Sequence, residues 1–199
     1  MVKNYNAIIL LLCSIISSSL AQGLTIIAVP WYFTAELNQS SMFSLGYSII
    51  TLIGLFWGLY AGVIIDNFNR KKILLYINTI AGLIFSIIGL FELSQDILNP
   101  FLIFIGFTTC SFYYIIFFPN LYALAQELTN KKHYVKINSF IEIFFQTTSI
   151  IAALLCGVLL AGSNVLLNHI NWDFFNFKAW TIGQIFLLNG LLYCITVIF

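Results

Sequence analysis

Six continuous apolar runs, separated by short polar segments, divide this chain of 199 residues. Each run is close to the roughly 20 residues that an α-helix needs to cross the hydrocarbon core of a bilayer. The runs do not alternate with a period of two residues, which excludes a transmembrane β-barrel. We predict an all-α membrane protein in which six transmembrane helices form one bundle. The predicted spans are 7–33, 42–65, 73–93, 100–121, 138–162 and 181–199.

The composition supports this class of protein. Hydrophobic residues make up 61% of the chain and charged residues only 8%, whereas soluble domains carry about 25% charged residues. A water-soluble fold of this length could not bury so much apolar surface. The net charge of +1 provides no general basic field for nucleic acid, so the bilayer is the expected environment and no nucleic-acid partner is expected.

The first run begins like a secretory signal peptide. Lys3 precedes an apolar core at Ala7–Ile16, and Ser19 and Ala21 have the spacing of a cleavage site. However, apolar residues resume and continue as far as Phe33, which makes the run long enough to span a bilayer. We therefore predict an uncleaved first span. A mature protein that starts at Gln22 would contradict this prediction.

Basic residues fall mainly on one side of the predicted topology. Seven of the eight Lys and Arg residues lie in the N-terminus and in the second and fourth loops: Lys3, Arg70, Lys71, Lys72, Lys131, Lys132 and Lys136. Only Lys178 falls on the other side. Because cytoplasmic loops carry the excess of Lys and Arg, we expect a cytoplasmic N-terminus. The expected location is a multi-pass protein of the bacterial inner (cell) membrane.

The sequence contains no constellation typical of an enzyme or a metal site. The two histidines, His133 and His169, lie in different loops. The four cysteines lie inside apolar runs without C-x-x-C spacing, as expected of buried hydrophobic residues: Cys13, Cys110, Cys156 and Cys194. We therefore expect no cofactor, no metal and no catalytic residue.

Two of the spans carry a stripe of polar side chains at helical spacing. The first span contains Ser14, Ser18, Gln22 and Thr25, and the fifth contains Asn138, Glu142, Gln146 and Ser149. Polar groups are costly against lipid, so both stripes should face protein or a water-filled path. One interpretation is that the stripes line a shared path for a solute. The other is that they form interhelical hydrogen bonds, worth about 0.6–2 kcal/mol each.

Glu142 is the one acidic residue clearly inside a predicted span. An ionisable residue at this depth marks a candidate site for a proton or another coupling cation. The alternative is that Glu142 reaches the interface or pairs with a nearby base such as Lys136.

A ladder of three glycines leads into a charged turn. Gly54, Gly58 and Gly62 are four residues apart, so they share one helix face and favour close packing against another helix. The run ends at Asp66, which three consecutive bases follow after a short turn, beginning at Arg70. This combination indicates a helix that moves against a neighbour.

This turn resembles the loop between the second and third helices of the major facilitator superfamily, which has the pattern G-x-L-A-D-R-x-G-R-R/K. The matching residues are Gly62, Asp66, Arg70 and Lys71. Asn67 replaces the usual Arg. Asn69 replaces the usual Gly, and Asn tolerates the left-handed conformation better than most residues.

A second stretch is similar to the F-x-P-A-L-x-A-L-x-P-E-L … A-N-S-L pattern of the macrolide-efflux and enterobactin-exporter branch. The matching residues are Pro119, Ala123, Leu124, Glu127, Leu128, Asn138 and Ser139. The branch commonly has Gly-Pro in the outer half of the fifth helix, where this chain has Ala152 and Ala153. Because Gly-Pro is associated with antiporters, the resemblance does not extend to proton-driven drug antiport.

The resemblance implies a secondary transporter that exports a hydrophobic or amphipathic small molecule by alternating access. A complete member has two six-helix bundles with the solute between them, and residues 1–199 correspond to the N-terminal bundle. The second bundle would come from missing C-terminal sequence, another chain or a homodimer. Asp66 would then act as a latch towards that bundle, and Arg70 and Lys71 would orient it.

The alternative interpretation is a half-unit that does not transport, either a truncated product or an assembly partner of a second six-helix subunit. The sixth predicted span ends at Phe199 without a polar flank. Six further helices encoded downstream would favour the transporter, and their absence would favour the half-unit.

Overall fold

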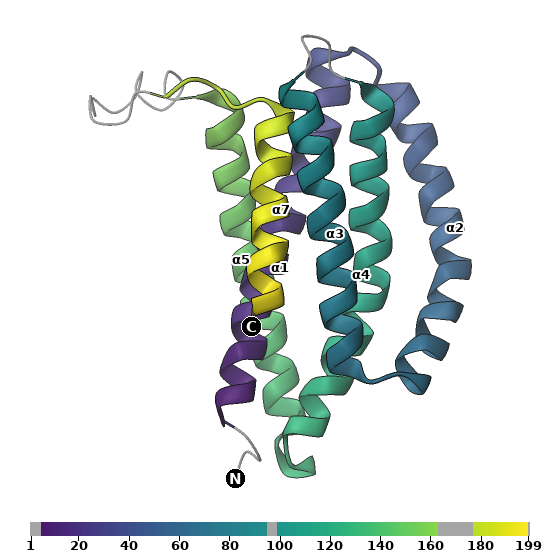
Figure 1. The fold of residues 1–199 in the computed structure, drawn as a ribbon, viewed down its shortest axis with the longest axis vertical. Helices are drawn as coiled ribbons and strands as arrows, with labels where there is room; N and C mark the ends of the chain where they lie inside the picture. The colour runs from purple at the N-terminus through teal and green to yellow at the C-terminus, as the bar shows by residue number, and fades with distance from the viewer. Residues whose placement is uncertain (1–4, 95–98, 163–176, 199) are drawn as a thin grey trace.

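The computed structural model describes residues 5–94, 99–162 and 177–198, and these residues are helical with no strand among them. Six long helices lie side by side along one axis (Figure 1). They are α1 (Tyr5–Trp31), α2 (Ser40–Asn67), α3 (Arg70–Leu93), α4 (Pro100–Leu128), α5 (Tyr134–Ala161) and α7 (Ile182–Ile198). A short π-helix (Tyr32–Glu36) continues α1, and a 3-10 turn (Lys131–His133) precedes α5.

The all-α prediction is confirmed, and the prediction of six spans is confirmed in part. Five of the described helices are long and apolar enough to cross a membrane, whereas α7 is apolar but has only 17 residues. Several helices extend past their predicted bounds: α4 continues to Leu128 rather than 121, and α5 begins at Tyr134 rather than 138. Apolar length reports the part of a helix inside the bilayer core, and a helix can continue beyond it.

Local sequence explains where several helices begin and end. The Asn69 side chain accepts a hydrogen bond from the Lys72 N–H at 3.2 Å and so caps α3. Asn99 caps α4 in the same way, with Pro100 at the first helical position. Asn69 has a φ of −65°, so the expected left-handed conformation is not used there. Its role is to satisfy a free N–H at the start of a helix.

Five of the described helices pack together, and α2 lies at the edge of this group. Helix α1 lies in the middle and contacts α4, α5 and α7, while α3 packs along α7 (Figure 1). Helix α2 packs mainly against α4. The outer side of α2 is apolar and open: Leu55, Leu59 and Tyr60 are 71%, 72% and 66% exposed. Such a surface suits contact with lipid or with another apolar helix.

Glycines produce the closest helix contact, between α3 and α7. A Cβ atom added at Gly89 would lie 2.8 Å from the Leu187 backbone nitrogen, and one added at Gly190 would lie 2.9 Å from the Ser86 nitrogen. Gly82 and Gly183 belong to the same contact. Without a hydrophobic force between helices in lipid, such close packing stabilises the pair through dispersion contacts.

The glycine ladder of α2 has few neighbours. A Cβ added at Gly54 would approach Ile115 to 3.1 Å, and one added at Gly58 would remain 3.9 Å from the same side chain. No described atom lies within 4 Å of the corresponding position at Gly62. Within the described residues, the ladder therefore packs closely at Gly54 only, and its lower part is open.

Aromatic residues fill the centre of the bundle. Phe85, Phe117, Phe186 and Tyr193 are almost completely buried. Phe85 packs edge-on against Phe186 with ring centres 5.1 Å apart, and Tyr113 packs against Tyr193 at 5.0 Å. These contacts join α3, α4 and α7 into one core.

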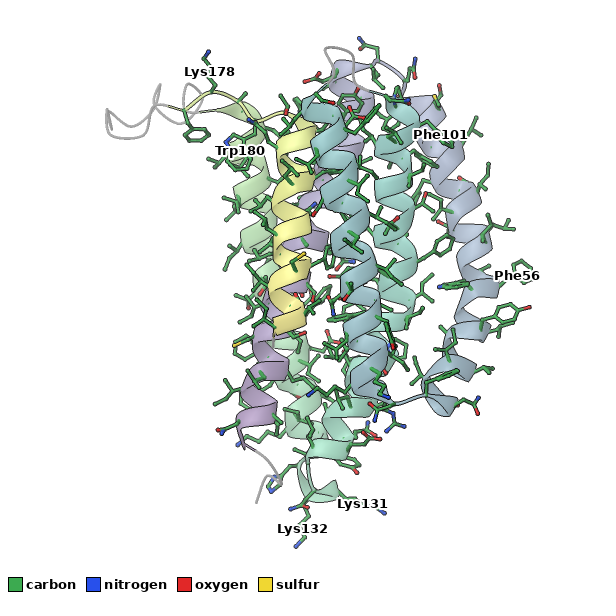
Figure 2. All side chains as sticks on the ribbon, in the orientation of Figure 1. Phe56, Phe101, Lys131, Lys132, Lys178 and Trp180 are labelled. Atoms are coloured by element: carbon green, nitrogen blue, oxygen red, sulfur yellow. The ribbon has the colours of Figure 1, made fainter. Side chains whose placement is uncertain are left out.

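The two ends of the bundle differ in charge. Lys131 and Lys132 lie at one end, together with the turn between α2 and α3, and Lys178 and Trp180 lie at the other (Figures 1 and 2). The fold therefore groups the described basic residues by end, as the sequence predicted, whereas Lys3 lies outside the described residues. We refer to the end with Lys131 and Lys132 as the basic end.

Candidate functional site

A cavity of about 280 Å³ lies between α1, α2 and α4. We call it the aromatic cavity. Its lining residues are Gln22, Ile26, Pro30, Phe43, Tyr47, Phe107, Cys110, Ser111 and Tyr114. No Asp, Glu, Lys or Arg occurs among these described lining residues, so the cavity is neutral and mostly apolar.

Three aromatic rings hold the shape of one side of this cavity. Phe43 and Phe107 pack edge-on with ring centres 5.3 Å apart, and Tyr47 packs against Phe107 at 5.8 Å. Phe43 and Tyr47 are stacked at 6.1 Å, one turn apart on α2. Phe107 is buried, whereas Tyr47 is 50% exposed. A flat apolar group could therefore pack against the Tyr47 ring, which the other two rings hold in place.

Gln22 is the one amide among the described residues that line the aromatic cavity. The side chain is half-buried, and its Oε1 atom is buried without a hydrogen-bond partner in the described part of the chain. A buried acceptor without a partner is costly. An N–H or O–H donor that reached this oxygen would remove that cost.

The other polar residues of the α1 stripe are used within the bundle. Ser18 and Thr25 are completely buried, and each hydroxyl donates to the backbone carbonyl four residues earlier, at 2.7 and 3.0 Å. Thr25 also accepts a hydrogen bond from Asn189 of α7 at 2.8 Å. Only Gln22 of the predicted path residues on α1 lines the aromatic cavity. Thr25 fits the alternative interpretation, that of interhelical bonding.

The predicted path residues of α5 lie elsewhere. Glu142 accepts a hydrogen bond from the Tyr122 hydroxyl of α4, and Gln146 is exposed one turn further along α5. Neither residue lines the aromatic cavity. The described residues show no ion pair between Glu142 and Lys136, which lies over the Phe140 ring. Glu142 is exposed, as the other part of that alternative expects. The sequence pattern did not identify Tyr122, since its role depends on the contact between α4 and α5.

At the basic end, the two motifs that were recognised separately meet. Arg70, at the first position of α3, donates to the Glu127 carboxylate of α4. Its guanidinium also lies 3.5 Å from the Ala123 carbonyl oxygen, and the Asn120 amide donates to the Arg70 carbonyl at 2.9 Å. These bonds attach the start of α3 to the end of α4. We call this group the Arg70–Glu127 clamp.

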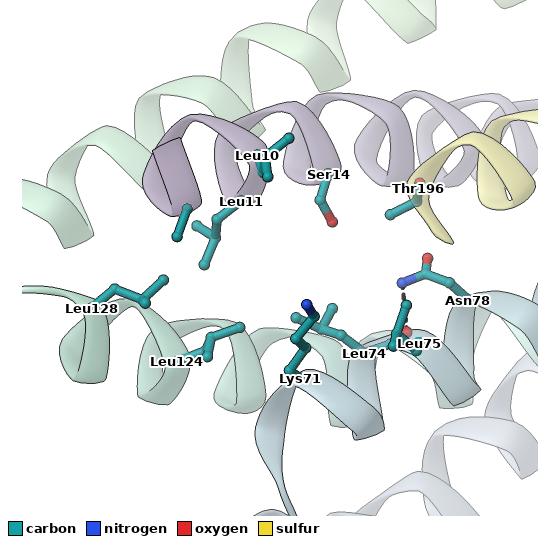
Figure 3. Close-up of a pocket in the computed structure, with 11 residues that line it drawn as sticks. Leu10, Leu11, Ser14, Lys71, Leu74, Leu75, Asn78, Leu124, Leu128 and Thr196 are labelled. Atoms are coloured by element: carbon teal, nitrogen blue, oxygen red, sulfur yellow. Dashed lines mark hydrogen bonds between the residues drawn. The ribbon is translucent and has the colours of Figure 1, made fainter. Parts of the chain in front are cut away.

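Asp66 does not take part in this clamp. It is exposed at the end of α2 and has no ion-pair partner in the described ranges. Arg70 is bound to Glu127 and so does not orient Asp66, contrary to the expectation from the resemblance. Lys71 points between α1 and α3 (Figure 3). Within the described residues, the end of α2, with Asp66 and the open Gly62, is thus without a partner, whereas the start of α3 beside it is held by the Arg70–Glu127 clamp.

Almost the whole chain is similar to one family of known proteins. The model of the Major Facilitator Superfamily matches residues 11–199. The chain belongs to the major facilitator superfamily. No curated protein and no solved structure matches it. The proteins of this superfamily are membrane transporters rather than enzymes, so this facilitator chain is an integral, multi-pass membrane protein of the transporter class.

Proposed function

We propose that this facilitator chain forms one half of a secondary transporter that exports a hydrophobic or amphipathic small molecule. The observation that carries the proposal is the aromatic cavity, whose described lining residues include aromatic rings and the Gln22 side chain and no charged side chain. Ligand pockets are typically apolar with a few polar groups that set orientation. A strongly charged solute would find no counter-charge on this wall.

Transport would occur by alternating access between this bundle and a second six-helix bundle. The second bundle would come from C-terminal sequence, another chain or a homodimer. The basic end would face the cytoplasm of a bacterial cell, because cytoplasmic segments carry the excess of Lys and Arg. Helix α1 begins at the same end (Figure 1).

Asp66 would be the latch that meets the second bundle. It is exposed and unpaired within the described residues, and the neighbouring face at Gly58 and Gly62 is open. The Arg70–Glu127 clamp would hold the start of α3 still while α2 moves. Glu142, with Tyr122 beside it, is the proposed site for a proton or another coupling cation, and Gln146 would extend the polar path.

The test uses export of Nile red, a neutral lipophilic dye, from cells that express the chain with its natural downstream sequence. Tyr47→Ala removes a ring that lines the aromatic cavity, and Tyr60→Ala removes another exposed ring of α2 outside it. We expect Tyr47→Ala to slow export several-fold and Tyr60→Ala to leave it unchanged. Collapse of the proton gradient should also reduce export if protons drive it.

Equal export by cells with and without the protein would contradict the proposed substrate class. Equal effects of the two tyrosine variants would contradict the role of the cavity. If no second bundle is encoded downstream or assembles with the chain, the half-unit that does not transport becomes the better interpretation.

A further inference from the structure

A second pocket, of about 150 Å³, lies at the basic end between α1, α3, α4 and α7 (Figure 3). We call it the Lys71 pocket. Its lining residues are Ala7, Leu10, Leu11, Ser14, Lys71, Leu74, Leu75, Asn78, Leu124, Leu128 and Thr196. It shares no residue with the aromatic cavity, so it is a separate feature of the molecule.

Lys71 gives the pocket a single positive charge. Its amino group points into the space between α1 and α3, opposite Ser14 (Figure 3). No Asp or Glu is among the described lining residues. Lys71 has no ion-pair partner among the described residues, and Glu127 of the neighbouring helix is bound to Arg70. The pocket therefore has an unbalanced cation at its edge.

The rest of the wall favours a hydrocarbon chain. Six leucines from α1, α3 and α4 line the pocket. The deeper polar groups are occupied: the Asn78 amide donates to the Leu74 carbonyl and accepts from Tyr113, and the Thr196 hydroxyl donates to the Leu192 carbonyl. A ligand would thus place its polar group at Lys71 and its apolar part among the leucines.

The position and size of the pocket limit the chemical class and the size of the ligand. Lys71 is the second residue of α3, at the end of the bundle that carries Lys131 and Lys132. This level corresponds to lipid headgroups, where basic pockets between helices bind anionic lipids. A leucine-lined cavity of about 150 Å³ accommodates a group the size of benzene. The pocket could therefore hold the first part of one acyl chain but not an entire lipid.

We propose that the Lys71 pocket binds an anionic phospholipid, with the phosphate at the Lys71 ammonium and the start of one acyl chain between the leucines. Binding would fix the start of α3 against α1, in addition to the Arg70–Glu127 clamp that holds α3 to α4. The proposal does not depend on transport activity, because it concerns charge and space within this bundle.

The test measures binding of phosphatidylglycerol to the purified full chain in detergent by native mass spectrometry. Phosphatidylcholine with the same acyl chains serves as the neutral-headgroup control, and glycerol phosphate serves as the headgroup without chains. We expect phosphatidylglycerol to bind more tightly than either. Lys71→Gln should weaken its binding about fivefold, as expected for one basic residue at a lipid surface, and Lys71→Arg should retain it.

Lys72→Gln is the matched control, since Lys72 carries the same charge on the next residue and does not line the pocket. It should leave phosphatidylglycerol binding unchanged. Equal losses in Lys71→Gln and Lys72→Gln would show general surface attraction and overturn the proposal. So would equal binding of phosphatidylglycerol and phosphatidylcholine, or binding of glycerol phosphate as tight as that of the lipid.

Discussion

Individual buried polar residues of this chain differ in whether the bundle provides a hydrogen-bond partner for them. The Tyr113 hydroxyl donates to Asn78 Oδ1 at 2.8 Å, and both residues are buried. Tyr193 is buried against Tyr113, but its hydroxyl has no hydrogen-bond partner among the described residues apart from a weak contact with the Cys110 thiol. A polar group in an apolar interior contributes stability only when its partner is present.

This difference predicts that two conservative substitutions change the free energy of unfolding by different amounts. Tyr113→Phe leaves the Asn78 oxygen without its donor and should lower the free energy of unfolding by about 1–2 kcal/mol. Tyr193→Phe removes a hydroxyl with little bonding to lose and should have an effect near zero. Unfolding of the purified variants in detergent, followed by circular dichroism, measures both. A larger loss for Tyr193→Phe would show that its hydroxyl has a strong partner.

A second prediction at this scale concerns Glu142. Glu142→Gln keeps a side chain that can bond to the Tyr122 hydroxyl but removes the titratable charge. If Glu142 carries the coupling proton, the variant should transport at a rate that no longer depends on pH across the neutral range. Transport assays at several pH values test this. Glu36→Gln, at the other end of the bundle, should retain the dependence, and an unchanged profile in Glu142→Gln would remove Glu142 from the coupling step.

At the scale of helices, the contact between α3 and α7 contrasts with the exposure of α2. Four glycines bring α3 and α7 together closely, whereas, among the described residues, the glycine ladder of α2 packs closely against α4 only at Gly54. The first pair is therefore rigid, because backbone atoms meet and cannot move aside. Helix α2, held along one side by α4, is the helix with a face left for a partner.

The contact predicts a position-dependent effect of adding a methyl group. Gly89→Ala would place its Cβ 2.8 Å from the Leu187 nitrogen and 3.0 Å from the Gly183 oxygen, so the helices must separate. We expect a loss of about 1–3 kcal/mol in stability. Gly157→Ala is the control, since no described atom lies within 4 Å of the added group, and it should be neutral or slightly stabilising. Thermal unfolding in detergent distinguishes them, and equal melting temperatures would contradict the close contact.

At the scale of the whole molecule, a fixed contact and an unpartnered segment lie next to each other at the basic end. The Arg70–Glu127 clamp fixes the start of α3, while Asp66 and the open part of α2 beside it have no partner in the described residues. The clamp itself is partly exposed, with side-chain exposures of 27% and 54%, so it should contribute no more than about 1 kcal/mol to stability. Its importance would lie in the position of α3 during the transport cycle.

This arrangement predicts that Asp66→Ala slows transport while leaving membrane insertion and stability unchanged, because the side chain makes no contact that the bundle needs. Asn67→Ala, at the next exposed position, is the control and should transport normally. Dye export, with membrane fractionation to quantify the inserted protein, gives both readouts. Normal transport by Asp66→Ala would refute the latch.

The amino-acid sequence by itself determined the class of the protein and the placement of its helices. Apolar runs as long as the bilayer is thick can only be helices, since every backbone polar group must be satisfied within the segment. The motif from Gly62 to Lys71 also identified the superfamily correctly, because its residues are close together in the chain. The exporter branch that the stretch from Pro119 to Leu128 suggested stays a prediction.

Only the tertiary structure decided which of these residues meet. Gly62 and Gly89 both lie in apolar helices, yet one is open and the other is in backbone contact. Thr25 and Gln22 share one polar stripe, but the first binds Asn189 and the second lines the aromatic cavity. Helical periodicity specifies a face of a helix and not its neighbour. The neighbour is set by the packing of all the helices together. This packing also pairs Arg70 with Glu127 and leaves Asp66 without an ion-pair partner among the described residues.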